Sequence, residues 1–228
     1  MEKLRNDELG ISILKGACNS EATDLAMELG EIGMNALLDD CILKEIPVLK
    51  SIIACRKTWE AIHDQLFLRK VAGFLTACPK FTDAEKDTFA RDHLSDRKKT
   101  SRLGDALVLI LDKLDDLEKP ELLAKAFTAL VRGRISLENF RRLGAAIDIG
   151  FIEDLRALAN ETRRLREVTE LHLPNLVRTG LAEINVRVDT SHAKVDGSGY
   201  SLVFRISVLG RLFIGCMNEE YEFKILDQ

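Results

Sequence analysis

The chain has 228 residues, of which 46% are hydrophobic and 31% charged, so it is long enough to bury a core and has the composition of a folded, strongly helical protein. Its formal net charge of −4 excludes a general electrostatic attraction to nucleic acid or to an anionic membrane. Aromatic residues make up only 6% of the chain, which is too few for extensive base stacking.

The five cysteines indicate a reducing compartment. Their number is odd, the chain contains no Cys-x-x-Cys pair, and most lie in apolar helical context, so we expect buried, reduced thiols. The polar start "MEKLRNDELG" is not followed by the apolar segment of a signal peptide, and no apolar run approaches the ~18 residues that a membrane span requires. The sequence therefore predicts a cytoplasmic protein.

Apolar residues recur at helical spacing in the first part of the chain. Residues 1–19 are weakly patterned, which is typical of a short or frayed helix. Firmer patterns predict helices at 20–37 and from Pro47 to Phe74, with the proline in the first turn.

Local start and stop signals define the helices that follow. Thr82 and Glu85 form the capping box "TDAE", which predicts a helix to about Leu94. The stretch "SDRKKTSR" then breaks the apolar period, and we expect a buried helix in "LGDALVLILDKL". Pro120 and Gly133 are expected to open and close the helix "PELLAKAFTALVRG", and a serine caps the next one, "LENFRRLGAAID".

After Gly180 the apolar period changes from about 3.6 residues to about 2, which is typical of strands. We expect residues 181–188 and 200–208 to pair as antiparallel strands, because their alternate apolar positions need one common face to bury. The apolar residues expected to be buried against the preceding helices are Ile184, Val186, Phe204 and Ile206. The predicted fold class is mainly α, with a helical bundle body at 1–135 and a winged-helix-like module with a small antiparallel β-sheet at 136–228.

The winged-helix order raises the question of DNA binding. Three predicted helices at 137–148, 151–160 and 162–179 precede the hairpin at 181–215. The candidate nucleic-acid contacts on the third helix and the hairpin are Arg163, Arg164, Arg166, Arg178, Arg187 and Lys194. Interspersed Asp and Glu residues offset these charges, whereas DNA-binding proteins show a basic surplus on this face. A transcriptional regulator is therefore an alternative, and use of the module for protein contact or core closure is favoured.

The segment 42–59 is amphipathic, moderately basic and ends in the only tryptophan. These features suit an interfacial helix that perturbs a membrane or binds a partner. They also suit a helix in a bundle with a basic outer face, and this interpretation is favoured. The candidate membrane or partner contacts are Lys44, Lys50, Arg56, Lys57 and Trp59.

The motifs of the common enzyme and metal sites do not occur. The chain has no G-x-S-x-G, Walker, H-E-x-x-H or G-x-G-x-x-G motif. "GRISLENF" resembles the end of a calcium-binding EF-hand loop, but the preceding positions hold valine and arginine instead of carboxylates. His63 and Asp64 have only His93 nearby as a further ligand. We therefore expect no catalytic residue, metal, cofactor or small-molecule substrate, while a site assembled from distant residues stays open.

Two parts of the chain resemble known bacterial groups. The runs "IPVLKSIIACRKTWEAIHDQLFLRKVAGFL" and "LEKPELLAKAFTALVRGRISLENFRRL" are similar to a loose set of uncharacterised bacterial helical proteins. The ending "GLAEI…YSLVFRISVLGRLFI" resembles that of the abortive-infection alpha group of phage-defence proteins, with Ser207 where that ending usually has threonine. The resemblance implies a bacterial or phage-related accessory protein, effector or regulator of phage defence. Together with the lack of catalytic motifs, it leads us to expect a non-enzymatic protein that acts through a protein partner or self-association.

Overall fold

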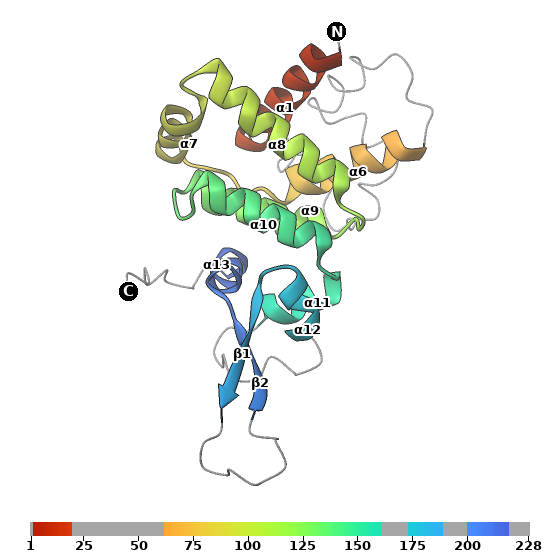
Figure 1. Cartoon of the computed structure of the whole chain (residues 1–228). Coiled ribbons are helices and arrows are strands. Elements are labelled where there is room, and N and C mark those ends of the chain that lie inside the picture. The colour runs from red at the N-terminus through yellow and green to blue at the C-terminus, as the bar shows by residue number, and fades with distance from the viewer. Residues whose placement is uncertain (1, 20–61, 161–172, 189–199, 219–228) are drawn as a thin grey trace, which may run out of the picture. The chain divides into compact units, whose positions relative to one another are not determined.

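The computed structural model describes residues 2–19, 62–160, 173–188 and 200–218 (Figure 1). The chain divides into two compact units, Met1–Gly144 and Ala145–Gln228. The described residues are mainly helical, with one small antiparallel sheet near the C-terminus, as the sequence predicts. The division lies after Gly144, inside the helix Leu137–Ile149.

The first unit is built from helices. They are α1 (Glu2–Asn19), α6 (Ile62–Ala77), α7 (Asp83–Phe89), the π-helix η1 (Ala90–Leu94), α8 (Arg97–Lys113), α9 (Lys119–Val131) and the first part of α10 (Leu137–Ile149). In this unit α1 lies against α8, and α6 lies against α9 (Figure 1). α1 has 18 residues and is therefore longer than the short helix that its weak pattern indicates.

The core of the first unit surrounds α9, which is buried almost all round. Phe127 on this helix is fully buried, and its ring makes edge contacts with Phe74, Phe89 and Phe140 at centroid distances of 5.5, 5.7 and 6.0 Å. A helix that is hydrophobic on every side needs neighbours on every side. This requirement explains why α6, α7 and α10 all contribute aromatic rings to the surroundings of α9.

The predicted start and stop signals are confirmed. Glu85 accepts from the backbone N–H of Thr82 and its own N–H donates to the Thr82 hydroxyl, so the capping box of α7 is complete. Ser136 caps α10 by accepting from the backbone N–H of Asn139. Gly133 follows α9 with a φ of +67°, the left-handed conformation that favours glycine.

The stretch "SDRKKTSR" interrupts the apolar period as predicted, but the helix that follows begins earlier than the predicted residue 103. Asp96 accepts from the backbone N–H of Lys98 and caps a helix that already begins at Arg97. The first two turns of α8 are largely exposed and polar, so they show no apolar period. The buried face of the helix begins only at Leu103 and continues at Leu107 and Leu111.

The second unit has the later part of α10, α11 (Ile152–Ala159), α12 (Leu173–Arg178), the strands β1 (Ala182–Val188) and β2 (Tyr200–Ile206), and α13 (Val208–Met217). The strands pair antiparallel, with Ala182 opposite Ile206 and Val188 opposite Tyr200. The predicted pairing is thus confirmed. Three helices, α11, α12 and α13, gather at one end of the hairpin, which extends away from them (Figure 1).

The expected extension of the second strand to residue 208 is wrong. The strand ends at Ile206, and Ser207 caps α13 by accepting from the backbone N–H of Gly210. Phe213 and Ile214 on this helix are fully buried, so the final apolar segment contributes to the core as a helix and not as part of the wing. Within the described part of the chain, no helix has both the length and the hydropathy that a membrane span requires.

Candidate functional site

The hairpin of the second unit begins where α12 ends in a Schellman motif. Gly180 has a φ of +76°, which only glycine adopts without strain. The backbone N–H of Gly180 donates to the carbonyl of Val177, and that of Leu181 donates to the carbonyl of Leu176, both at 3.1 Å. This helix ending turns the chain into β1 and determines where the strand starts.

Ser207 joins the two ends of the hairpin. Its hydroxyl donates to the carbonyl of Gly180 at 2.6 Å, and its backbone N–H donates to the carbonyl of Leu181 at 3.0 Å. A methyl group at Gly210 would overlap the Leu181 carbonyl and lie 2.7 Å from the side chain of Ile206. Glycine at 210 therefore lets α13 approach the backbone at the base of the hairpin.

The register places apolar residues on one face of the hairpin. Ala182 lies opposite Ile206, Ile184 opposite Phe204, and Val186 opposite Leu202. Residues that are directly opposite in an antiparallel pair project to the same face, and alternate residues share that face. We call the outer part of this face, formed by Ile184, Val186 and Phe204, the hairpin face.

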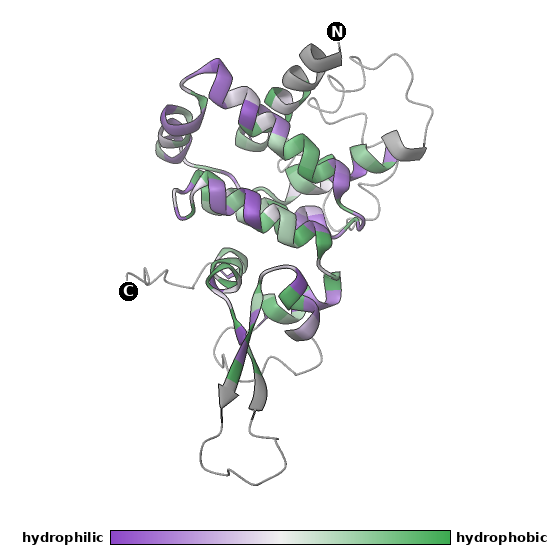
Figure 2. Ribbon diagram, viewed as in Figure 1, coloured by the Kyte–Doolittle hydropathy of each residue, from purple (hydrophilic) through white to green (hydrophobic). Residues whose placement is uncertain are grey.

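The helices cover the base of the hairpin but not the hairpin face. Ala182 and Ile206 are 4% and 8% exposed, whereas Ile184 is 47% and Val186 61% exposed. Hydrophobic residues continue along the strands beyond the helices (Figure 2). The expectation that all four apolar positions are buried is therefore wrong for Ile184 and Val186. Phe204 is half-buried.

The opposite face of the hairpin is polar. Glu183 lies opposite Arg205, and the amide of Asn185 donates to the Glu183 carboxylate at 3.4 Å. The charged residues of the described strand segments therefore lie on the other side from the hairpin face. An apolar face without charge can associate with another apolar surface without burying an ion.

The predicted nucleic-acid contacts are only partly described. Arg178 is exposed at the end of α12, and Arg187 lies in β1 opposite Ser201. Arg163, Arg164, Arg166 and Lys194 lie outside the described residues. The arrangement of these six residues therefore stays a prediction.

The predicted membrane or partner helix at 42–59, with Lys44, Lys50, Arg56, Lys57 and Trp59, also lies outside the described residues. His63 and Asp64 lie in α6, and His93 lies in η1. Across the described ranges, His, Cys, Asp and Glu side chains form no group of three that could hold a metal ion. The absence of a metal, of a cofactor and of catalysis stays a prediction.

The exposure of the hairpin face is the feature that sequence reasoning missed. Alternating apolar residues indicate one buried face, but they do not reveal how much of that face other elements cover.

Comparisons of the chain with protein-family models, with curated proteins and with solved structures found no match.

Proposed function

We propose that the chain is a non-enzymatic bacterial interaction protein, acting in phage defence as an accessory, effector or regulator, and that it works through the hairpin face. The observation that carries the proposal is the exposure of Ile184 and Val186 beside a half-buried Phe204. Apolar patches rimmed by polar residues mark protein interaction sites on soluble proteins. The link to phage defence rests on the resemblance of the C-terminal ending to the abortive-infection alpha group.

The C-terminal module is, on this proposal, winged-helix-like in its order of helices and hairpin, with α13 packed at the base. Its wing is used for protein contact. The exposed apolar pair on β1 supports this use, because a DNA-contacting wing carries cationic side chains to reach phosphates.

The occupant of the hairpin face is a second copy of the chain. In a two-fold contact the same patch meets itself, so Ile184 and Val186 of one copy face apolar residues of the other. The charged residues Glu183 and Arg205 lie on the opposite face and stay in water. Homodimer interfaces are more apolar than transient ones, which fits a face without charge.

A matched pair of variants tests self-association. Val186→Glu places a carboxylate on the hairpin face, and Asn185→Glu places the same group on the opposite face of the same strand. Because Val186 is 61% exposed, its replacement costs little folding free energy. Sedimentation equilibrium is expected to show dimers for the wild type and Asn185→Glu, and monomers for Val186→Glu.

A wild-type chain that is monomeric at every accessible concentration would contradict self-association. Phage plating on bacteria that express each variant tests the biological part: protection is expected from the wild type and Asn185→Glu, and its loss from Val186→Glu. Equal plating on all strains, including cells without the protein, would contradict the role in phage defence.

A further inference from the structure

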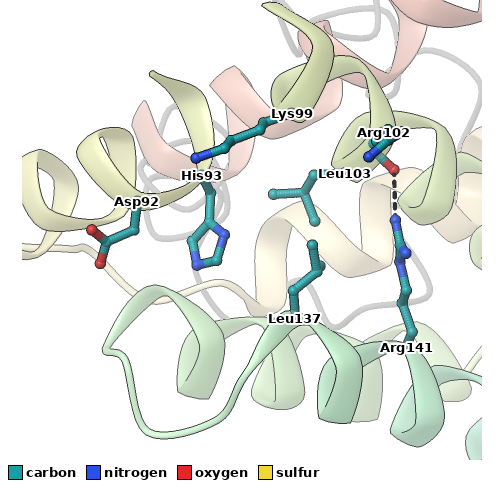
Figure 3. A pocket seen from close by; sticks show the side chains of 7 residues that line it. All are labelled: Asp92, His93, Lys99, Arg102, Leu103, Leu137 and Arg141. Atoms are coloured by element: carbon teal, nitrogen blue, oxygen red, sulfur yellow. Dashed lines mark hydrogen bonds between the residues drawn. The ribbon is translucent and has the colours of Figure 1, made fainter. Parts of the chain in front are cut away.

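The first unit contains a cavity that no sequence motif predicts. Its volume is about 240 Å³, and it lies between η1, α8 and the first part of α10. Leu103 and Leu137 point toward each other in its middle, with His93 on one side and Arg141 on the other (Figure 3). Lys99 and Arg102 on α8 and Asp92 on η1 complete the lining.

The cavity is cationic within an acidic protein. Lys99, Arg102 and Arg141 supply three positive charges and Asp92 one negative charge, a net charge of +2, whereas the whole chain carries −4. The Asp92 side chain points away from Arg141 (Figure 3). Like charges that gather without a counterion repel one another, so this arrangement favours binding of an anion.

Within the described part of the chain, the three cations are exposed and, like Arg97 and Lys98 on α8, lack the ion pairs that other cations of the first unit form. Lys125, Arg132 and Arg142 each form an ion pair with a glutamate. Among the residues that the structure describes, no carboxylate lies within ion-pair distance of Lys99, Arg102 or Arg141. Arg141 instead donates to the backbone carbonyl of Arg102 at 3.3 Å, which orients its guanidinium and leaves its other N–H groups available.

The wall opposite Arg141 is formed by a π-helix. This conformation is rare, occurs mostly as single turns and is frequent at functional sites. Here it places the His93 ring at the cavity, 5.2 Å from the ring of the buried Phe89. Burial lowers the pKa of His93 below its usual value, although the nearby Asp92 opposes the shift. The lowered pKa favours the neutral imidazole, which offers one N–H donor.

We propose that this cavity binds a small phosphate monoester, with the phosphate held by the cations that line it, Lys99, Arg102 and Arg141, and the organic group against Leu137. A phosphate monoester carries a charge of about −2 at neutral pH, which matches the cavity, whereas a carboxylate carries half of that. Guanidinium groups present paired donors that fit phosphate oxygens. The volume is below the roughly 300–1,000 Å³ of pockets that take drug-sized ligands, so the organic group is small.

Isothermal titration calorimetry with phenyl phosphate tests the site, with inorganic phosphate and benzoate as comparison ligands. The test variant is Arg141→Gln, and the matched control is Arg142→Gln, because Arg142 follows it on α10, is exposed and pairs with Glu138. Lys99→Gln and Lys98→Gln form a second matched pair on α8. Circular dichroism of each variant establishes that it is folded.

We expect saturable binding of phenyl phosphate to the wild type and binding at least about tenfold weaker for benzoate and inorganic phosphate. Arg141→Gln and Lys99→Gln are expected to weaken the binding of phenyl phosphate at least about tenfold, and the two control variants by less than about twofold. Absence of saturable binding, equal affinity for inorganic phosphate, or equal losses in test and control variants would overturn the proposal. The site lies in the first unit, so this result is independent of hairpin self-association.

Discussion

At Gly210 the backbone of α13 approaches the carbonyl of Leu181. Ser207 holds the same junction, because its hydroxyl donates to the carbonyl of Gly180 and accepts from the backbone N–H of Gly210. The position of the hairpin face therefore depends on two small residues. Serine and threonine both carry the hydroxyl that this geometry requires, which gives a physical reason for either residue at 207.

Replacement of Gly210 by alanine is expected to destabilise the second unit by about 1–3 kcal/mol, because the new methyl group overlaps a backbone carbonyl that cannot rotate away. This exceeds the gain of about 1 kcal/mol that alanine brings to a helix interior. Urea unfolding measures the change.

Gly73→Ala is the control. Its methyl group would lie 3.6 Å from Pro120, an ordinary contact, so this variant is expected to gain about 0.5–1 kcal/mol of stability. A Gly210→Ala chain as stable as the wild type would show that α13 does not approach this closely.

Glu85 connects α7 to the end of α9. Its carboxylate accepts from the backbone N–H of Thr82 at 2.7 Å and from the guanidinium of Arg132 at 3.0 Å. The backbone hydrogen bond is the main cause, and the Thr82 hydroxyl and Arg132 are further causes, of a pKa below the usual value for this carboxyl. The ionised form is thus preferred in the folded state.

The pH dependence of stability follows from this direction. A carboxyl whose folded pKa is lowered stabilises the protein above its unfolded pKa of about 4.3, and this contribution is lost as pH falls through the folded pKa. We expect Glu85→Gln to lower the urea midpoint at neutral pH and to have less effect in acid. Asp87→Asn, on the exposed side of the same helix, is the control. An equal effect of Glu85→Gln at both ends of the pH range would contradict the ion-dependent contribution.

Among the elements, α1 and α8 cross at two glycines. A methyl group on Gly104 would lie 2.8 Å from the backbone carbon of Gly10, and the two helices make extensive contact around this point. Backbone atoms on both sides leave no flexible side chain that can move aside. The crossing distance is therefore set by the absence of side chains at both positions.

Gly104→Ala is expected to separate α1 from α8 and to destabilise the first unit by about 1–3 kcal/mol. Amide hydrogen exchange is expected to accelerate in α1 more than in α9, because α1 has its main contact at this crossing. Lys98→Ala, on the exposed first turn of α8, is expected to change stability by less than about 0.5 kcal/mol. Unchanged exchange in α1 would contradict the crossing.

At the scale of the whole molecule, the net charge limits the affinity of the chain for nucleic acid. Its net charge is −4, and the cationic cavity of the first unit is lined by only three cations. Affinity for DNA comes largely from neutralised phosphates, and a small basic patch neutralises few of them.

We therefore predict no DNA binding tighter than the non-specific range, with Kd roughly 10⁻⁴ to 10⁻⁶ M at physiological salt. Fluorescence anisotropy with a labelled duplex at rising salt measures it, and any weak binding at low salt is expected to fade. Nanomolar, sequence-selective binding that is lost in Arg164→Ala would support the alternative of a transcriptional regulator.

Several features of the fold follow from residues that are close in sequence. The capping box at Thr82, the serine cap at 136 and the glycines at 133 and 180 act through hydrogen bonds and backbone conformations within a few residues. The change of apolar period after Gly180 is likewise local, because successive side chains of a strand point to alternate faces. For this reason these helix limits and the antiparallel hairpin were predictable.

Other features of the fold depend on tertiary contacts and could not be predicted from local sequence. The start of α8 at Arg97 has no apolar period because its first turns face water. The predicted second strand extends to residue 208, past its end at Ile206, because the apolar residues of α13 follow the strand without a break. The outer half of the hairpin was expected to be buried, since spacing alone does not say how far a covering helix reaches.

The sequence by itself determined a mainly helical chain with a C-terminal hairpin, because helix caps, glycine turns and apolar periods depend on neighbouring residues. Only the tertiary structure decided that Ile184 and Val186 stay exposed and that Lys99, Arg102 and Arg141 meet at one cavity. Exposure depends on which elements cover a face, and the cavity joins residues from η1, α8 and α10. Such properties belong to several segments at once, so no single stretch of the sequence contains them.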